Sequence, residues 1–180
     1  MALEIAAALN AELDLIVCRK IPLPLSPEGG FGAITDDGTM VLNEEIVRAH
    51  GLTREQIDFE ASRVRENVRQ RSAKYRGGAP PVRVNGKTVI IVDDGLATGL
   101  TMMAAVESVR HRHPKEIVVA VPIAPEKTAS QMRRVANRVV TGATADMKKY
   151  YLADFYRNWR DIKDEEIIRS LDQWHARRFG

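Results

Sequence analysis

One stretch of the sequence, from Thr88 to Val106, constrains the fold more than any other. It reads TVIIVDDGLATGLTMMAAV, which is a short apolar run, two adjacent carboxylates, a loop of small residues and a helix-forming segment. A continuous apolar run of this length is typical of a strand that is buried on both faces of a parallel sheet. Two like charges side by side at the end of such a strand require either a structural or a functional explanation.

The segments that follow this stretch repeat its alternation of strand and helix. A second apolar run covers 116–125, a second helix is expected from residue 126, and a shorter strand covers 138–144. Strand–helix–strand alternation with apolar strands predicts an α/β fold, in which helices cover both faces of a mainly parallel sheet. A chain of 180 residues is long enough for one such domain and short for two.

The first part of the chain predicts further elements before the parallel sheet. A helix is expected in MALEIAAALNAEL and a buried strand from Asp14 to Arg19. The segment 21–32 holds three prolines and three glycines, so we expect a mobile loop there. A short hairpin is expected to turn at Asp37-Gly38.

A long surface helix is expected over 53–76, as an insertion in a single domain that covers 1–180. Thr53 and Gln56 fit a capping box, and an apolar stripe recurs at helical spacing at Ile57, Ala61, Val64 and Val68. GGAPP at 77–81 ends this helix. The residues 150–180 form a C-terminal tail that mixes aromatic and charged side chains. Its aromatic residues are expected to pack, with base stacking as the alternative.

Composition limits the classes of partner. The net charge of +3 is too small to predict a nucleic-acid partner, although six basic residues gather in the predicted surface helix: Arg63, Arg65, Arg69, Arg71, Lys74 and Arg76. They form either a solvated face or a functional patch. No apolar run approaches the ~20 residues that span a bilayer, so no membrane partner is expected. The chain has a single cysteine, Cys18, which cannot form an intramolecular disulfide, so a reducing cytoplasm is expected. Cys18 lies in an apolar run and is expected to be a small residue of the core.

The carboxylates and the loop after them predict a binding site. In open parallel sheets, ligands bind outside the carboxyl ends of the strands, where Asp93 and Asp94 stand. A turn-forming pair or a helix N-cap is the structural alternative for these two residues. The loop that follows holds small and hydroxyl side chains before a helix, and it favours an anion because unpaired N–H groups lie at a helix N-terminus. The loop lacks the Gly-Lys-Ser/Thr of a Walker motif, since Leu100 follows Gly99.

A phosphate site directly after two carboxylates suits a sugar phosphate. The loop would hold the phosphate, and the carboxylates would accept hydrogen bonds from the adjacent sugar hydroxyls. The ordered series VIIVDDGLATGLT resembles the phosphoribosyl-diphosphate signature of the type I phosphoribosyltransferases. VDDxLATGxTMxAA is most similar to the adenine form of that signature. With the Arg-Lys strand end and the YRGG.PP segment, the sequence resembles phosphoribosyltransferases of unassigned substrate over about residues 2–170.

The resemblance implies a phosphoribosyltransferase-like three-layer α/β/α fold and a transfer of the 5-phosphoribosyl group from phosphoribosyl diphosphate to a nitrogen base. It implies that Asp93 and Asp94 bind the ribose hydroxyls and stabilise a cationic transition state. Arg19 and Lys20 would contact pyrophosphate. The 5′-phosphate would lie on Ala97, Thr98, Gly99, Leu100 and Thr101. Mg²⁺ would be held mainly by substrate and water, with no direct protein ligand, and the protein is expected to form a homo-oligomer, a dimer.

The resemblance does not identify the base that accepts the phosphoribosyl group, and it does not establish whether the chain is catalytically active. The 6-oxopurine enzymes carry an acid at the position of Ala97, so hypoxanthine-guanine activity is not expected. Related chains place a strand with an Arg-Gly-Gly-type pyrophosphate loop before the first helix, and here that strand would lie between those ending at Arg19 and Asp93. We expect a start upstream of Met1, with loss of the segment or replacement by another element as alternatives. A non-catalytic ribose-phosphate sensor that binds RNA through the Arg63–Arg76 helix is the alternative function.

Overall fold

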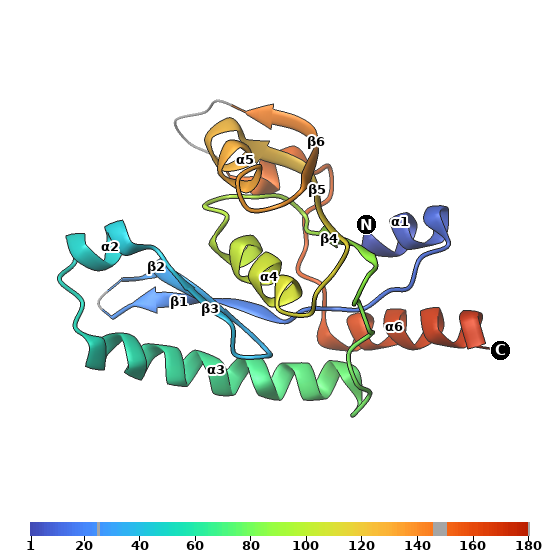
Figure 1. Ribbon diagram of the computed structural model, residues 1–180, viewed down its shortest axis with the longest axis horizontal. Helices are drawn as coiled ribbons and strands as arrows, with labels where there is room; N and C mark the ends of the chain where they lie inside the picture. The colour runs from blue at the N-terminus through green and yellow to red at the C-terminus, as the bar shows by residue number, and fades with distance from the viewer. Residues whose placement is uncertain (25, 146–150, 180) are drawn as a thin grey trace.

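Two three-stranded sheets form the framework of the protein, and one helix lies between them (Figure 1). The computed structural model describes residues 1–24, 26–145 and 151–179. The antiparallel sheet has the order β1-β2-β3, with β1 Cys18–Leu23, β2 Ser26–Thr35 and β3 Met40–Leu42. The parallel sheet has the order β4-β5-β6, with β4 Thr88–Val92, β5 Glu116–Pro125 and β6 Arg138–Ala145. Helix α4, Leu100–Arg110, packs on strands of both sheets.

The parallel sheet confirms the predicted α/β fold. Strand β5 lies in its centre, and six of its ten residues are buried. The predicted apolar face of α4 is confirmed too, since Met102, Val106 and Val109 are each at most 2% exposed. Together with α5, Glu126–Met132, these elements enclose the larger of the two main hydrophobic cores.

Strand β4 departs from its predicted burial. Its sequence TVIIV predicts a strand that is covered on both faces, yet Thr88 is exposed and the other four residues are only half-buried. The cause is its position, because β4 pairs with β5 along one edge and with no described strand along the other.

The antiparallel sheet corrects two expectations. The strand predicted from Asp14 to Arg19 begins only at Cys18, because 13–17 has no strand to pair with in the described structure. Within the predicted mobile loop 21–32, residues 21–23 and 26–32 belong to the antiparallel strands β1 and β2, and Ile21 and Phe31 are fully buried. The pairing shifts in register around Pro22, and such irregularities let a hairpin accept proline. The turn at Asp37-Gly38 is confirmed, with Gly38 at φ 88°.

The helices mostly follow the predicted pattern. Helix α3, Arg54–Arg76, starts with the predicted capping box, in which the side chains of Thr53 and Gln56 each bond the other's backbone N–H. Its apolar stripe packs on the antiparallel sheet and forms a second core. The other helices are α1 Ala2–Leu9, α2 Glu44–Ala49, the 3₁₀ helix Leu152–Phe155 and α6 Asp164–Phe179. None of the helices in the described ranges has the length and apolarity needed to cross a membrane.

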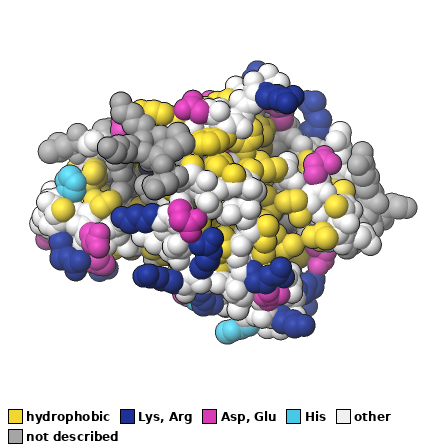
Figure 2. Space-filling view, turned by 90° about the horizontal axis from the view of Figure 1, so that it is seen from above, with side chains coloured by type: hydrophobic (Ala, Val, Ile, Leu, Met, Phe, Trp, Pro, Cys, Tyr) yellow, Lys and Arg dark blue, Asp and Glu magenta, His cyan; other side chains and the backbone are white. Residues whose placement is uncertain are grey.

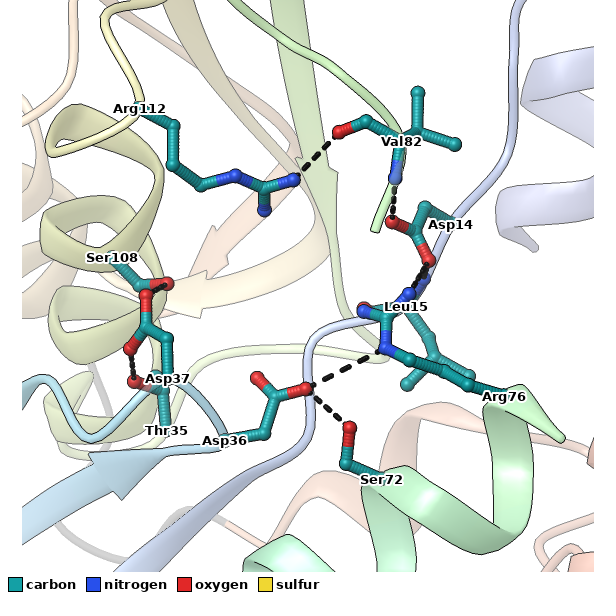
Figure 3. Close-up of polar contacts among 10 residues, drawn as sticks. All are labelled: Asp14, Leu15, Thr35, Asp36, Asp37, Ser72, Arg76, Val82, Ser108 and Arg112. Carbon is teal, nitrogen blue, oxygen red and sulfur yellow. Dashed lines mark hydrogen bonds and ion pairs between the residues drawn. The ribbon is translucent and has the colours of Figure 1, made fainter. Parts of the chain in front are cut away.

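A polar cluster joins the two halves of the molecule (Figure 3). The Arg76 guanidinium, at the end of α3, donates to the carboxylate of Asp14 at 2.5 Å and to the carbonyl of Leu15. Asp14 in turn accepts a hydrogen bond from the backbone N–H of Val82, 2.9 Å away. The carbonyl of Val82 accepts from Arg112, which follows α4. The cluster therefore ties α3 to the segments that enter and leave the parallel sheet.

A second cluster ties the β2–β3 turn to α4. The Asp37 carboxylate accepts hydrogen bonds from the hydroxyls of Thr35 at 2.6 Å and Ser108 at 2.5 Å (Figure 3). Desolvation opposes the charged form, but these two bonds and the backbone N–H of Thr39 outweigh it and lower the pKa of Asp37 to about 2. The helix that begins at the candidate site is thus held against the antiparallel sheet.

Candidate functional site

The two predicted carboxylates lie where β4 ends, at the carboxyl edge of the parallel sheet. Asp93 is exposed and Asp94 is half-buried. An Asp93 carboxylate oxygen accepts a hydrogen bond from the backbone N–H of Asp94 at 2.9 Å. This bond lies directly after the last residue of β4, where the chain leaves the strand.

The environment of Asp93 disfavours its negative charge. The side chain reaches solvent, but it also lines a concave surface whose atoms limit its hydration. This desolvation, with the charge of Asp94 beside it, raises the pKa of Asp93 to about 6, against the bond from the Asp94 N–H, which lowers it. A carboxylate kept in an unfavourable position at a strand end is typical of a functional site rather than of a stabilising turn.

Hydrogen bonds to β5 and α5 hold the loop 95–99 that follows the carboxylates. The backbone N–H of Leu96 donates to the carbonyl of Ile123 at 3.1 Å, and the Thr128 hydroxyl donates to the carbonyl of Ala97 at 2.8 Å. The Leu96 side chain is 2% exposed and anchors the loop in the core. The next two residues, Ala97 and Thr98, stay exposed. The loop is therefore rigidly attached, while the part predicted to receive a phosphate faces solvent.

Gly99 shows why the loop needs a glycine before the helix. It has φ 80°, in the left-handed region, and a Cβ there would lie 2.9 Å from Cγ2 of Thr128. Gly99 is the N-cap of α4, so no side chain of its own caps the helix, and none from elsewhere in the described structure does so. The N–H groups of the first turn remain available for an anion, which the helix dipole also favours.

The structure places the start of β1 beside this loop. The Cys18 thiol donates to the carbonyl of Thr101, with a sulfur–oxygen distance of 3.4 Å. Burial raises the pKa of Cys18 to about 12, so the thiol stays protonated and serves as a weak donor. Arg19 and Lys20 follow directly and are exposed, and the Lys20 ammonium donates to the carbonyl of Glu28 across the hairpin, at 2.6 Å. Their contact with pyrophosphate stays a prediction.

The C-terminal tail contributes residues that the sequence did not assign to the site. The Tyr156 hydroxyl donates to the carbonyl of Asp94, and the Leu152 side chain covers Gly95 so closely that a Cβ there would lie 2.2 Å from it. Tyr156 also packs edge-on against Trp159, with ring centroids 5.2 Å apart. Tyr156 therefore has the packing role that was expected for the aromatic residues of the tail. Through Tyr156 and Leu152, the tail also contacts the start of the loop at Asp94 and Gly95. Tyr156 and Asp94 are 62 residues apart in the sequence and share no motif, so their contact could not be predicted from the sequence.

A cavity of about 770 Å³ adjoins the site on the far side of β4 from β5. Its lining runs from Asp93 and Thr101 at one end to Asp14 and Arg112 at the other. This is the region, between the strand ends at Arg19 and Asp93, in which the resemblance placed a further strand.

The oxygen ligands at the site suit a hard cation such as Mg²⁺ that takes most of its ligands from substrate and water. No cluster of three or more His, Cys, Asp or Glu side chains with metal-binding geometry occurs in the described parts of the chain. Asp93 and Asp94 offer carboxylate oxygens, which Mg²⁺ prefers, and Mg²⁺ commonly keeps water and substrate oxygens as its remaining ligands. The site therefore fits a Mg²⁺ ion that arrives with a phosphorylated substrate.

The geometry defines a class: an α/β domain with a carboxylate pair and an anion-binding loop at the carboxyl end of a parallel strand. Comparison with known proteins identifies the family. A sequence profile described as "Phosphoribosyl transferase domain" matches residues 52–149. The chain belongs to this family.

Similar proteins agree with this assignment. Proteins of two Mycobacterium tuberculosis strains, provisionally named phosphoribosyl transferases, are 35% identical over 97% of this chain and 39% of their own. The chain thus spans about two fifths of the length of these relatives. The Bifunctional protein PyrR 1 of Lactiplantibacillus plantarum is 48% identical over 50 residues, 27% of this chain and 28% of that one. The crystal structure of TT1426 from Thermus thermophilus matches with a TM-score of 0.76 and 31% identity, over 96% of this chain and 81% of its own.

Proposed function

We propose that the protein transfers the 5-phosphoribosyl group from phosphoribosyl diphosphate to a nitrogen base, with release of pyrophosphate, in the cytoplasm. One observation carries the proposal: a carboxylate pair and an uncapped helix N-terminus are held side by side by the loop between β4 and α4. The first suits vicinal sugar hydroxyls and the second suits a phosphate. Membership of the phosphoribosyl transferase domain family supports the same assignment.

Each part of the site has a separate task in this reaction. The backbone N–H groups of residues 97–101 would bind the 5′-phosphate and fix the position of the ribose. The carboxylates of Asp93 and Asp94 would accept hydrogen bonds from the 2′- and 3′-hydroxyls. When pyrophosphate leaves C1 with the bonding electrons, positive charge develops on the ribose ring, and two nearby carboxylates stabilise it. The base nitrogen then forms the new bond to C1 and releases its proton to solvent.

The remaining groups assist departure and positioning. Mg²⁺ bound to the substrate would neutralise charge on the leaving pyrophosphate. Arg19 and Lys20 would contact the pyrophosphate from the start of the β1–β2 hairpin. The Tyr156 hydroxyl, which holds the Asp94 carbonyl, would keep the carboxylate loop in place without touching the substrate.

A turnover measurement tests this function. Pyrophosphate release from phosphoribosyl diphosphate is followed with Mg²⁺ and a panel of purine and pyrimidine bases, in the wild-type protein and in Asp94→Asn. We expect base-dependent release that falls by at least about a hundredfold in the variant, as for other groups that stabilise developing charge. Asp161→Asn, at an exposed position in the tail, is the matched control and should retain the wild-type rate. Equal turnover by wild type and Asp94→Asn would refute the proposed role of the carboxylates.

The alternative of a non-catalytic ribose-phosphate regulator has a specific test in the same experiment. Binding of ribose 5-phosphate without turnover by any base would favour it. Its RNA-binding form is weakened by the structure, because most basic side chains of α3 are already engaged. The pairs are Arg54–Asp58, Arg63–Glu60, Arg69–Glu66, Arg71 and Lys74 with Asp164, and Arg76 with Asp14. These pairs reduce the positive charge that the helix presents to a phosphate backbone.

A further inference from the structure

One segment of the tail, 151–163, contacts the chain directly after β4 and leads into α6 (Figure 1). We call this segment the latch. After its 3₁₀ helix, residues 156–163 form neither helix nor strand. Within the latch only Leu152, Ala153 and Tyr156 are half-buried, while its other residues are exposed. The attachment of the latch to the protein is therefore concentrated in its first half.

Gly95 provides a notch for the first of these side chains. A Cβ at this position would lie 2.2 Å from Cδ1 of Leu152, and 3.1 Å from both Cγ2 and the carbonyl oxygen of Ile123 in β5. The φ of Gly95 lies outside the left-handed region, so the backbone itself does not require glycine there. The lack of a side chain at residue 95 is instead explained by the packing of the latch and β5 on this position.

Tyr156 attaches the latch one residue earlier in the chain, at Asp94. Its hydroxyl donates to the carbonyl of Asp94, and its ring packs edge-on against Trp159. Burial raises the pKa of Tyr156, and the negative charges of Asp94 and Asp93 raise it further. The hydroxyl therefore stays protonated at neutral pH and remains a donor. The latch thus holds the backbone of a residue whose carboxylate we assign to the ribose hydroxyls.

The rest of the latch is poorly packed. Half of the large apolar side chains that are exposed in the described ranges lie within it, namely Tyr151, Phe155, Trp159 and Ile162. Apolar side chains reach the surface over the middle of the face in Figure 2, so their exposure in the latch does not by itself indicate a binding surface. Segments with few buried apolar side chains open more readily than a core. The latch can therefore leave the loop while the core stays folded.

The far end of the latch is tied to α3 and α6. The Asp164 carboxylate, at the start of α6, accepts hydrogen bonds from the Tyr75 hydroxyl at 2.7 Å and from the Lys74 ammonium at 2.9 Å. Arg160 of the latch donates to both carboxylate oxygens of Glu166 in α6, at 2.8 Å and 2.7 Å. A short segment that is tethered in this way closes again at a low entropic cost.

We propose that the latch is coupled to the site: it docks on Asp94 and Gly95 when a phosphorylated ribose is bound, and it opens more often when the site is empty. This inference rests on the proposed function, which assigns the ribose hydroxyls to the carboxylates. A ligand that holds Asp94 by its carboxylate orders the same residue that Tyr156 holds by its carbonyl, so each ordering makes the other less costly. By reciprocity, the factor by which the ligand reduces opening equals the factor by which opening weakens binding of the ligand.

Limited proteolysis measures the opening on the whole chain. Arg157 is exposed and directly follows Tyr156, so trypsin can cut after it when the latch opens. Mass spectrometry identifies the product that begins at Asn158, and a synthetic trypsin substrate controls for effects on the protease. We expect saturating ribose 5-phosphate to slow this cut at least about threefold in the wild type, through the coupling of the two sites.

Two variants of the latch extend the test without changing the loop. Leu152→Ala combined with Tyr156→Phe should speed the cut at least about fivefold without ligand, which is the factor for one hydrogen bond of ordinary strength. Its affinity for ribose 5-phosphate in calorimetry should fall, but by no more than the factor by which the ligand slows the cut in the wild type. Tyr151→Phe, at an exposed position outside both attachments, should match the wild type in both assays. Cooperative thermal unfolding confirms that each variant is folded.

The outcomes separate the latch from the site. Ribose 5-phosphate that binds in calorimetry but leaves the cut after Arg157 unchanged would overturn the coupling and leave the proposed function intact. So would equal cutting and equal affinity in the folded double variant and the wild type. Absence of ribose 5-phosphate binding to the wild type in calorimetry would refute the proposed function, and the coupling with it.

Discussion

Replacing Asp93 by asparagine should make the protein more stable at neutral pH, although it removes a carboxylate that we assign to the site. The pKa of Asp93 in the folded protein is about 6, compared with an ordinary value of 3.8. Because the folded value is the higher one, the folded state binds more protons than the unfolded state between these two pH values. The free energy of unfolding therefore falls as pH rises from about 4 to about 6, and the full penalty is present at pH 7.

The size of this effect follows from the shift and from the exposure of the side chain. Full conversion of the shift would give about 3 kcal/mol. Asp93 is exposed, and solvent screening reduces such values, so we expect a gain of about 1 kcal/mol for Asp93→Asn at pH 7 and none at pH 3. The asparagine oxygen can still accept the hydrogen bond from the Asp94 N–H. The turn itself should therefore remain.

Urea denaturation at pH 3 and pH 7 measures this difference directly. Asp161→Asn, at an exposed position, is the control for a general change in net charge, and it should shift stability by less than about 0.5 kcal/mol at both pH values. If Asp93→Asn were less stable than the wild type at pH 7, Asp93 would be a structural turn residue. The argument that it is kept in an unfavourable position for function would then be wrong.

Three further outcomes follow from the structure. Arg76→Met should lower the free energy of unfolding by about 3 kcal/mol, because it removes the positive charge that pairs with the Asp14 carboxylate and leaves the Leu15 carbonyl without its Arg76 donor. Chemical denaturation measures this, and a loss below about 1 kcal/mol would contradict it. Gly99→Ala should lower the free energy of unfolding by about 2 kcal/mol, because residue 99 has a left-handed backbone and an added Cβ would be crowded. The same variant should bind ribose 5-phosphate more weakly in calorimetry. Unchanged stability would contradict this prediction. Affinity for ribose 5-phosphate should fall as pH drops from 7 to 5, since Asp93 takes up a proton near pH 6; an affinity that rises toward pH 5 would contradict the role of its ionised form.

The sequence allowed prediction of the elements that rest on local patterns. The capping box at Thr53, the buried face of α4 and the strand–loop–helix unit around Asp93 were all predicted, because each depends on residues a few positions apart. The carboxylate pair and the loop were recognisable for the same reason, since the site lies within one continuous stretch of chain.

The predictions that failed depend on partners distant in the sequence. Prolines in 21–32 indicated a loop, but pairing of β1 with β2 and burial of Phe31 outweigh that local preference. The apolar composition of β4 predicted full burial, which requires a strand on each side, and composition carries no information about whether both are present. The contact of Tyr156 with Asp94 was not predicted at all, because it joins two segments that share no motif.

Calorimetric titration with phosphoribosyl diphosphate in the presence of Mg²⁺ tests the central claim most directly. The claim is that the carboxylates after β4 and the loop before α4 form one site for a phosphorylated ribose. The wild type should bind with one site per chain, and the variant that carries both Asp93→Asn and Asp94→Asn should show no measurable binding while remaining folded. Unchanged affinity in the folded double variant would contradict the claim.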